Sequence, residues 1–444
     1  MTFDEALRYL LGLGHETLAI KLGLANVRRL LAALSHPERD FPAVQIAGTN
    51  GKGSTAAMLD AILRAADIKA GLYTSPHLIS ITERIKINGR EISRADFARH
   101  TERVHAASLA LRDEAGALPS FFEQVTAIAL SVFSDARVEL AILETGLGGR
   151  LDATTAAGAS VVAITPVALD HQEYLGSTIA EIANEKAAII HAGAEAVVAP
   201  QLPEALAVIL ARCRETGVAP RFSTDDIEVL GATDDGRLRA TFRTGADLYE
   251  NVALALRGRH QLTNAATAIA LAELLRARGF TQITRACIGA GLESAEHAGR
   301  LELIKGEPAI LLDGAHNPAG ALALRDYLDE FAGGRYITLL FGAMRDKDLV
   351  AISSVLFPVA SRLVLTAADN PRSAVPGSLA EIALRVFPTS KTELAASVPQ
   401  ALGIARALTL HGGIICATGS LYLVGEVKSL LARDDELESR SGKT

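Results

Sequence analysis

The sequence predicts an α/β protein with a P-loop NTPase-like N-terminal domain, which carries a small β subdomain, and a Rossmann-like, doubly wound C-terminal domain. Three observations lead to this class. A strand, a glycine-rich turn and a helix follow one another within residues 41–66, a second apolar strand at 138–143 ends in Glu144, and strands alternate with helices from residue 308 to residue 431. Such alternation is typical of a mostly parallel sheet covered by helices.

The glycine-rich turn at residues 47–54 is the first motif with a chemical meaning. Glycines let backbone N–H groups close on phosphate oxygens, Lys52 is placed to reach the β- and γ-phosphates, and the Ser54 hydroxyl is placed to ligate Mg²⁺. The strict GxxxxGK[ST] spacing is not met, because two residues separate Gly48 from Gly51 and Gly53 follows Lys52. For this motif alone, an ordinary turn between strand and helix stays open as the alternative.

Size and composition set the outer limits. The 444 residues suggest two or three domains, and a net charge of −7 gives no sign of a general nucleic-acid or membrane-surface role. Cys213, Cys287 and Cys416 fit neither zinc nor disulfide spacing. The N-terminus lacks the pattern of a signal peptide, and no apolar run reaches membrane length. We therefore expect a soluble, cytoplasmic protein that binds neither nucleic acid nor membranes.

Helices are expected through much of residues 4–34 and at 94–112, the second with His100 and His105 on its exposed face. A further apolar helix begins at 120–123. Ser75 follows the strand at 71–73, and strand carboxyl ends are where α/β sheets present ligand groups.

Glu144 has the position of the second acid of a phosphate-loop site. It ends an apolar strand, so its carboxylate would face the Mg²⁺ held by the loop hydroxyl. The glycine-rich segment 146–152 follows directly and is able to approach a ligand closely; a plain turn is its alternative.

Asp170 and His171 follow another buried strand at 161–164. A single histidine in that place is either a ligand or a structural residue, and the residues alone leave both open. The helix at 177–190 contains Lys186, which by itself is expected to be an exposed helix lysine.

A change of period marks the small β subdomain, where alternating segments within about 221–256 predict antiparallel hairpins. A long apolar helix follows from 260 to about 278. We place the domain boundary near residue 295, giving domains of 1–295 and 296–444. In the second domain the predicted elements are strands at 308–312, 335–341, 361–366 and 413–417 and helices at 318–331, 346–355, 377–386, 396–409 and 420–431. Its candidate ligand residues lie just after strands, at 313–318 and 418–420.

Taken together, these motifs resemble those of one family, the bacterial folylpolyglutamate synthase/dihydrofolate synthases of the Mur ligase superfamily. The resemblance spans nearly the whole chain. The motifs that carry it are AGTNGKGS (47–54), YTSPHL (73–78), ERI (83–85), FFE (121–123), ETGLGGRLDAT (144–154), LDH with LG (169–176), EKAAII (185–190), HQLTNA (260–265), LLDGAHNPAG (311–320), FGAMRDKD (341–348) and TGSLYL (418–423).

The resemblance implies an ATP-dependent amide ligase of tetrahydrofolate biosynthesis, in which MgATP binds between two domains. The γ-phosphoryl group passes to a carboxylate of dihydropteroate or of a reduced folate, and the amino group of L-glutamate then attacks the acyl phosphate. Phosphoryl transfer between two anions needs positioning and charge neutralisation, which two Mg²⁺ ions and a lysine would supply. The family also implies a monomer.

The resemblance assigns roles to individual residues. Ser54 and Glu144 match ligands of the first Mg²⁺, and Ser75, Glu144 and His171 match ligands of the second. Lys186 matches a lysine that is carbamylated in the family, which would replace a cation by a carboxylate. The expected catalytic residues are Lys52, Glu144, His171 and Lys186. The residues matching ATP contacts are Gly48, Thr49, Asn50, Gly51, Lys52, Gly53, Ser54, Asn264, Arg300, Asp313 and His316.

A second group matches the pteroate-binding part of the family. Ser120, Phe121, Phe122 and Glu123 would meet the pterin, where an aromatic ring stacks on the ligand. Arg84 is the candidate for a substrate carboxylate. The loop that would contact the pteroate contains Leu151, Asp152 and Ala153.

Two departures from the family pattern leave an alternative open, in which the enzyme has folylpolyglutamate synthase activity alone. Thr155 stands where the family usually has asparagine, and Lys21 stands where some dihydropteroate-using members have an acid. A Mur-type peptidoglycan ligase is a remote alternative, because only 47 residues precede Gly48, too few for a UDP-sugar-binding domain. A nucleotide-binding regulator without ligase activity is the other, and it would be expected to lack metal or lysine positions that are present here.

Overall fold

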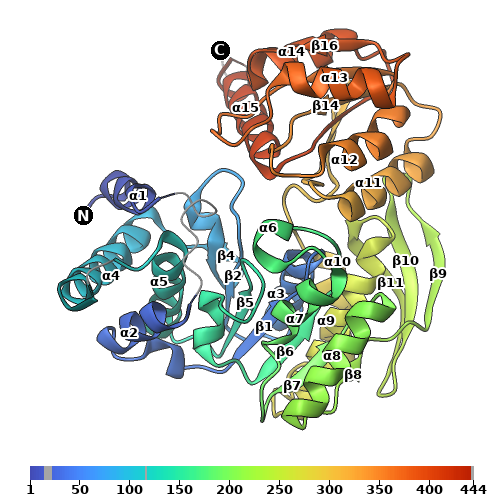
Figure 1. Ribbon diagram of the computed structural model, residues 1–444. Coiled ribbons are helices and arrows are strands. Elements are labelled where there is room, and N and C mark those ends of the chain that lie inside the picture. Colours follow the sequence, from blue (N-terminus) through green and yellow to red (C-terminus); the bar gives the residue numbers. More distant parts are fainter. Residues whose placement is uncertain (15–22, 116–117, 442–444) are drawn as a thin grey trace.

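The computed structural model describes residues 1–14, 23–115 and 118–441. The described residues form three sheets, of eight, three and six strands. In Figure 1 the eight-stranded sheet lies in the lower body of the molecule, the three-stranded sheet stands at its right edge, and the six-stranded sheet forms a separate unit at the top. This arrangement confirms the predicted α/β class. The predicted boundary near residue 295 falls between α10 (Arg285–Ser294) and β12 (Glu302–Ile304).

The large sheet has the order β4-β3-β2-β5-β1-β6-β7-β8, and its central strands run parallel. Only β3 and β4, at one edge, pair antiparallel. The strands are β1 (Ala43–Ala47), β2 (Ala70–Tyr73), β3 (Ile85–Ile87), β4 (Arg90–Glu91), β5 (Leu140–Glu144), β6 (Val161–Ile164), β7 (Glu195–Val198) and β8 (Arg221–Phe222).

Helices cover both faces of this sheet, because its central strands are apolar on both sides. One face packs against α3 and α9, with α10 on the far side of α3. The other face is covered by the helices α1, α2, α4 and α5 over one half and by α7 and α8 over the other. The bounds are α1 (Phe3–Gly12), α2 (Ala25–Ala33), α3 (Lys52–Ala65), α4 (Arg94–Ala115), α5 (Phe121–Ala136), α6 (Gln172–Leu175), α7 (Ile179–Ala187), α8 (Pro203–Thr216) and α9 (His260–Ala277).

The small antiparallel sheet consists of β9 (Ile227–Ala232), β10 (Arg237–Arg243) and β11 (Leu248–Arg257), in the order β11-β10-β9. It begins later than predicted. Residues 221–222 form β8, which pairs parallel with β7 in the large sheet. A two-residue edge strand carries too little periodicity to be separated from the alternating segment that follows it.

The C-terminal sheet has the order β12-β13-β17-β14-β15-β16, with β12 antiparallel at its edge. The predicted strands and helices are confirmed, whereas β12 and β16 (Thr392–Leu394) were not predicted; both are three-residue edge strands. The other elements are β13 (Ala309–Leu312), α11 (Pro318–Phe331), β14 (Ile337–Phe341), α12 (Leu349–Leu356), β15 (Arg362–Leu365), α13 (Pro376–Val386), α14 (Val398–Leu408), β17 (Ile414–Thr418) and α15 (Leu421–Ser441).

The prediction that His100 is exposed is wrong. Its ring is buried between α4 and α5, where Nδ1 lies 3.0 Å from Ser131 Oγ and Nε2 lies 3.5 Å from an oxygen of Asp135. His105 is half-buried, with its ring 4.0 Å from that of Tyr9. Contacts between helices distant in sequence bury this face. No described helix is both long and apolar enough to cross a membrane.

Helix α3, which follows the glycine-rich loop, is clamped between the sheet and α10. Gly291 of α10 makes the closest approach: a Cβ atom there would lie 2.4 Å from Ile62 Cα of α3. Glycine is therefore required at this crossing. Gly289, two residues earlier in the same helix, has no atom within 4 Å of its own Cβ position.

We predict that Gly291→Ala lowers the melting temperature, with a loss of stability of about 1–3 kcal/mol, because two backbones must separate. Gly289→Ala is the matched control. It changes the same residue type in the same helix and should be neutral or stabilising by about 0.5–1 kcal/mol. Calorimetry on both variants measures the difference, and equal melting temperatures would contradict the packing account.

Candidate active site

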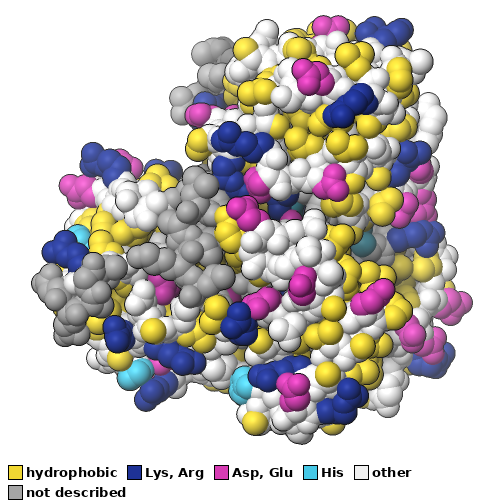
Figure 2. Space-filling model, in the orientation of Figure 1, with side chains coloured by type: hydrophobic (Ala, Val, Ile, Leu, Met, Phe, Trp, Pro, Cys, Tyr) yellow, Lys and Arg dark blue, Asp and Glu magenta, His cyan; other side chains and the backbone are white. Residues whose placement is uncertain are grey.

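One cavity of about 350 Å³ lies at the carboxyl ends of β1, β5 and β6 and is closed from above by the C-terminal unit. In Figure 2 a hollow opens between the two parts, and both basic and acidic side chains lie at its edge. The N-terminal lining includes the whole loop 48–54, and the C-terminal lining includes residues 313–317. A crevice beyond strand carboxyl ends is where open α/β sheets bind ligands.

The glycine-rich loop owes its shape to two close approaches. Gly48 has φ +152° and Gly51 has φ +88°. A Cβ at Gly48 would lie 1.9 Å from Thr165 Oγ1, and one at Gly51 would lie 2.2 Å from Asn264 Oδ1. The predicted strand–turn–helix context is confirmed, since β1 leads into the loop and Gly51 is the residue before α3.

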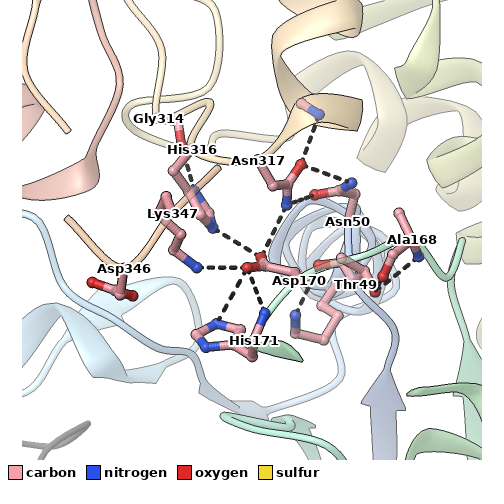
Figure 3. Close-up of polar contacts among 12 residues, drawn as sticks. Thr49, Asn50, Ala168, Asp170, His171, Gly314, His316, Asn317, Asp346 and Lys347 are labelled. Carbon is pink, nitrogen blue, oxygen red and sulfur yellow. Dashed lines mark hydrogen bonds and ion pairs between the residues drawn. The ribbon is translucent and has the colours of Figure 1, made fainter. Parts of the chain in front are cut away.

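The segment after β6 fastens the loop. The N–H groups of Thr49 and Asn50 donate to Pro166 O, at 3.0 and 3.2 Å. The Thr49 hydroxyl donates to Ala168 O at 2.9 Å and accepts from Ala168 N–H at 3.0 Å. The loop and the segment carrying Asp170 and His171 therefore form one unit (Figure 3).

Two lysines converge on the loop backbone. Lys52 Nζ donates to Gly48 O and Thr49 O, both at 3.1 Å, and Lys186 Nζ donates to Gly48 O at 2.7 Å. Lys186 is 5% exposed, so the expectation from its helix alone, an exposed lysine, is wrong. Burial lowers the pKa of Lys186 to about 7, and the nearby charge of Lys52 adds to this effect. Burial also lowers the pKa of Lys52, against the opposing charge of Glu144.

Glu144 ends β5 at the floor of the cavity, and Oε2 accepts the N–H of Ser75 at 3.1 Å. Burial raises the pKa of Glu144, while Lys52 opposes the rise. A cation beside this carboxylate would favour its charged form. Ser54, Ser75 and His171 line the same cavity, so the four predicted metal ligands all border it.

Asp170 is the centre of a cluster that joins the two parts of the molecule (Figure 3). Oδ1 lies 2.5 Å from Lys347 Nζ, and Oδ2 lies 3.0 Å from Asn317 Nδ2 and 3.5 Å from His316 Nε2. Asn317 also donates to Asn50 Oδ1 at 3.1 Å. The β6–α6 segment and the loop are thus connected directly to α11 and to the segment after β14.

The charges in this cluster fix its protonation. Although burial raises the pKa of Asp170, the hydrogen bond from His316 and the charge of Lys347 hold that pKa well below its usual range. Burial lowers the pKa of His171 to about 3, with Asp170 opposing and Lys347 reinforcing the shift. His171 is therefore neutral at neutral pH, which is the form that ligates metals.

The remaining residues matched to ATP contacts also line the cavity. Asp313 Oδ2 accepts from Leu301 N–H and Oδ1 from Ala315 N–H, both at 2.9 Å, so its carboxylate is held by backbone. Burial raises the pKa of Asp313, and Arg300 opposes the rise. His316 Nδ1 lies 2.8 Å from Gly314 O.

The residues matched to the pteroate do not line this cavity. Ser120 and Glu123 form a capping box at the start of α5, and Phe121 is buried under the Arg84 guanidinium, 5.5 Å from its ring centre. Phe122 is only half-buried. Its ring lies over Gly146, where a Cβ would be 2.4 Å from Cζ, and so borders the loop 146–152.

Hydrogen bonds made by Asp152 and Thr155 hold the loop 146–152 in place. Asp152 accepts hydrogen bonds from Leu147 N–H at 2.9 Å and from the Thr154 hydroxyl at 2.5 Å. In the same segment Leu151 is half-exposed and Ala153 is buried. Burial raises the pKa of Asp152, and the bond from Thr154 opposes the rise. Thr155, one of the two departures, donates to Gly149 O at 2.7 Å. Lys21, the other, lies outside the described residues.

Three residues of the site were given no role by the sequence: Asp170, His297 and Lys347. Asn317 lies in the candidate segment 313–318, but no role was assigned to it individually. Asn317 and Lys347 stand inside motifs quoted above, so the signal was present but was attached to neighbouring residues. His297 lies in an irregular segment after α10, and its Nδ1 is 3.1 Å from Ser54 Oγ. Burial lowers the pKa of His297 to about 3, with Arg300 adding to the shift.

The donor set fits Mg²⁺ better than zinc. In the described part of the chain no three His, Cys, Asp or Glu side chains are grouped closely enough to hold a metal ion. Mg²⁺ does not need such a group, because it keeps several waters and is bound by one or two carboxylates together with substrate phosphates. Glu144, the hydroxyl of Ser54 and the neighbouring glycine-rich loop would suit that kind of site.

Comparison with protein families gives two matches. Residues 46–272 match the Mur ligase middle domain, and residues 299–421 match the Mur ligase glutamate ligase domain. The chain is 34% identical to the dihydrofolate synthase/folylpolyglutamate synthase of Mycobacterium tuberculosis, over 93% of this chain and 91% of that protein.

It is 37% identical to a probable bifunctional folylpolyglutamate synthase/dihydropteroate synthase of Halobacterium salinarum, over 98% of this chain and 52% of that protein. A similar relative from Haloferax volcanii is matched over 51% of its length. The chain thus spans about half the length of these two relatives.

Solved structures are similar over the whole chain. The Mycobacterium tuberculosis folylpolyglutamate synthase complexed with ADP superposes with a TM-score of 0.89 at 32% identity, covering 96% of this chain and 98% of that one. The Escherichia coli FolC in complex with DHPP and ADP gives 0.86 at 30%, covering 98% and 99%. A Yersinia pestis enzyme complexed with AMPPNP and Mn ion gives 0.82 at 29%, covering 97% and 98%.

We predict that Lys347→Met lowers the melting temperature by removing the counter-ion of a buried carboxylate, a loss of about 3 kcal/mol. Lys428→Met is the matched control, because its pair with Glu302 is also short (2.6 Å) but 28% exposed on both sides, and it should cost about 1 kcal/mol at most. Adding Asp170→Asn to Lys347→Met should restore part of the loss. Equal effects of the two lysine variants would contradict the cluster's role.

The pKa of about 7 for Lys186 predicts a pH dependence. Protonated below that pH, the amine becomes neutral and nucleophilic as the pH rises through about 7. Lys186 can be labelled competitively with trace acetic anhydride in CO₂-free buffer, with a free lysine amide as the reference and mass spectrometry as the readout. The labelling rate of Lys186 should reach half of its high-pH maximum near pH 7. Labelling that rises only near pH 10, as for an ordinary lysine, would show that the amine is not perturbed.

Proposed function

The chain belongs to the dihydrofolate synthase/folylpolyglutamate synthase family of the Mur ligases, and from that premise we propose that it is an ATP-dependent carboxylate–amine ligase. Its proposed substrates are ATP, L-glutamate and either dihydropteroate or a reduced folate. The observation that carries the proposal is a cavity in which the glycine-rich loop 48–54 and the buried carboxylate of Glu144 border the same space as residues 313–317 of the C-terminal unit.

Three solved relatives support ATP as the substrate, because each was obtained with an adenine nucleotide or its analogue. In this chain the nucleotide phosphates would lie on the N–H groups of the loop and at the start of α3, where the helix dipole favours an anion. Lys52 is positioned on the loop itself, so its ammonium would neutralise the β- and γ-phosphates.

The proposed reaction has two steps. The substrate carboxylate attacks the γ-phosphorus, the bond to the ADP oxygen breaks, and an acyl phosphate and ADP form. The amine of L-glutamate then attacks the acyl carbon, phosphate leaves, and the amine loses a proton as the amide bond forms. The chain's contribution is to hold two anions together and to exclude water from the acyl phosphate.

We further propose that divalent metal ions, two Mg²⁺ in the working enzyme, are held by Ser54, Ser75, Glu144 and His171. They would supply charge neutralisation at the transferring phosphoryl group. The Yersinia pestis relative was crystallised with a Mn ion, which supports a divalent metal but not the count. The neutral His171 would suit a metal ligand, and the carboxylate of Glu144 is placed at the end of β5 by the N–H of Ser75.

Lys186 is proposed to be carbamylated. A neutral amine is required for reaction with CO₂, and a pKa of about 7 makes that form available at neutral pH. The carbamate would place a negative charge beside Gly48 and near the metal ligands. We predict that Lys186→Ala is inactive and is partly rescued by a small carboxylate such as formate; no rescue at any concentration would remove the carbamate proposal.

The pterin is proposed to lie against Phe122 and the loop 146–152. Of the two phenylalanines, only Phe122 is partly exposed, because Phe121 is buried under Arg84. Ser120 and Glu123 act through the capping box that begins α5 and so position Phe122. Monomeric state and cytoplasmic location stay predictions.

The second candidate is an enzyme with folylpolyglutamate synthase activity alone, which the departures at Thr155 and Lys21 favour. Phosphate release by the purified protein with MgATP and L-glutamate separates the two. With dihydropteroate and a reduced folate run in parallel, turnover with both means a bifunctional enzyme, and turnover with the reduced folate alone means a dedicated folylpolyglutamate synthase. No glutamate-dependent release with either would leave a nucleotide-binding regulator.

Glu144→Ala should lower turnover by at least about a hundredfold, because a ligand worth several kcal/mol of charge stabilisation is lost. Glu139→Ala is the control, since Glu139 is exposed just before the same strand and bonds to Lys69 N–H. The assay is the same phosphate release under saturating substrates. Near-normal activity of Glu144→Ala would refute its role.

A further inference from the structure

The hydroxyl of Ser54, a proposed metal ligand, contacts two other side chains. His297 Nδ1 lies 3.1 Å from Ser54 Oγ, and Gln261 Nε2 lies 3.4 Å from the same oxygen. Ser54 is 5% exposed, so water does not replace these partners freely. The carbonyl of the Gln261 amide accepts from Asn264 Nδ2 at 2.8 Å, which leaves the NH₂ group of Gln261 to donate to Ser54.

A serine hydroxyl has one proton and two lone pairs. The Gln261 amide uses one lone pair, and a metal ion on Ser54 would use the other. The proton then needs an acceptor. Among the side-chain contacts of the described residues, His297 Nδ1 is the one group at Ser54 that can accept it.

The position of the imidazole is fixed by close packing. A Cβ on Gly53 would lie 2.7 Å from His297 Cε1 and 3.3 Å from Glu144 Oε1, so His297 and Glu144 approach the loop from the same side. Gly53 is the residue that interrupts the strict phosphate-loop pattern. Its lack of a side chain makes room for His297 beside Ser54.

We propose that His297 is a positioning residue: its Nδ1 accepts a hydrogen bond from the Ser54 hydroxyl and so turns an oxygen lone pair toward the metal ion. This inference rests on the proposed metal role of Ser54. The imidazole must carry its own proton on Nε2. This positioning role does not require His297 to touch the nucleotide or the metal.

The tautomer of His297 tests this directly and needs no loss of function. In ¹⁵N-edited NMR of the unsubstituted protein, with the His297 signals assigned by their absence in His297→Asn, Nδ1 should be unprotonated and Nε2 protonated. An Nδ1–H tautomer would overturn the proposal, because Nδ1 would then donate to the oxygen rather than accept from it.

Metal-dependent nucleotide binding is the second measurement. We would titrate ADP with and without Mg²⁺ by calorimetry into wild type, His297→Leu and His297→Asn. His297→Leu removes the acceptor but keeps apolar bulk over Gly53, whereas Asn offers an oxygen in place of Nδ1. The gain in ADP affinity on adding Mg²⁺ should fall roughly 10–100-fold in His297→Leu and stay near the wild-type value in His297→Asn, with metal-free ADP affinity unchanged in both.

The outcomes separate this inference from the proposed function. If His297→Leu keeps the full Mg²⁺ effect while Ser54→Ala loses it, His297 has no positioning role and the ligase proposal stands. If wild type itself shows no Mg²⁺ effect, the metal role of Ser54 is wrong and the inference fails with it. Loss of metal-free ADP binding in His297→Leu would indicate a merely structural residue.

Discussion

The site depends on one buried carboxylate, Asp170. A buried charge is costly unless it is paired and hydrogen-bonded. Its partners here are Lys347, His316 and Asn317, all from the C-terminal unit, and the backbone N–H of His171. Satisfying this carboxylate therefore requires the C-terminal unit to stand over the phosphate loop, which is the arrangement that a ligand between the two domains needs.

The glycine-rich loop is also held by close contacts within the N-terminal domain. The N–H groups of Thr49 and Asn50 are tied to the segment after β6, and the lysines at positions 52 and 186 share the carbonyl of Gly48. Two ammonium groups at one carbonyl repel each other, which is consistent with the lowered pKa of Lys186. A carbamate on Lys186, as proposed, would turn that repulsion into attraction.

Much of this architecture was predictable, because strands with uninterrupted apolar runs and helices with clear caps give strong local signals. The loop at 47–54, Glu144 at the end of β5 and the alternation after residue 308 all belong to that class. The burial of Lys186 and His100 was not predictable from their own helices, because other parts of the chain cover them.

Short edge strands and loop residues set the other limit. β8, β12 and β16 have two or three residues each, too few for a period to show. His297 lies in an irregular segment, so only the folded chain reveals that it reaches Ser54. Motifs identified the right segments but not which of their residues, Asn317 or Lys347, would join the domains.

In the proposed reaction a phosphoryl group passes to a substrate carboxylate within the cavity. The most direct test is to supply the folate or pteroate substrate with ¹⁸O in its reacting carboxylate, together with ATP and L-glutamate, and to analyse the released phosphate by mass spectrometry. One ¹⁸O atom in each phosphate is the predicted result, because the acyl phosphate oxygen leaves with phosphorus when the amide forms. Phosphate without ¹⁸O, released while the amide product accumulates, would contradict an acyl phosphate and with it this reading of the site.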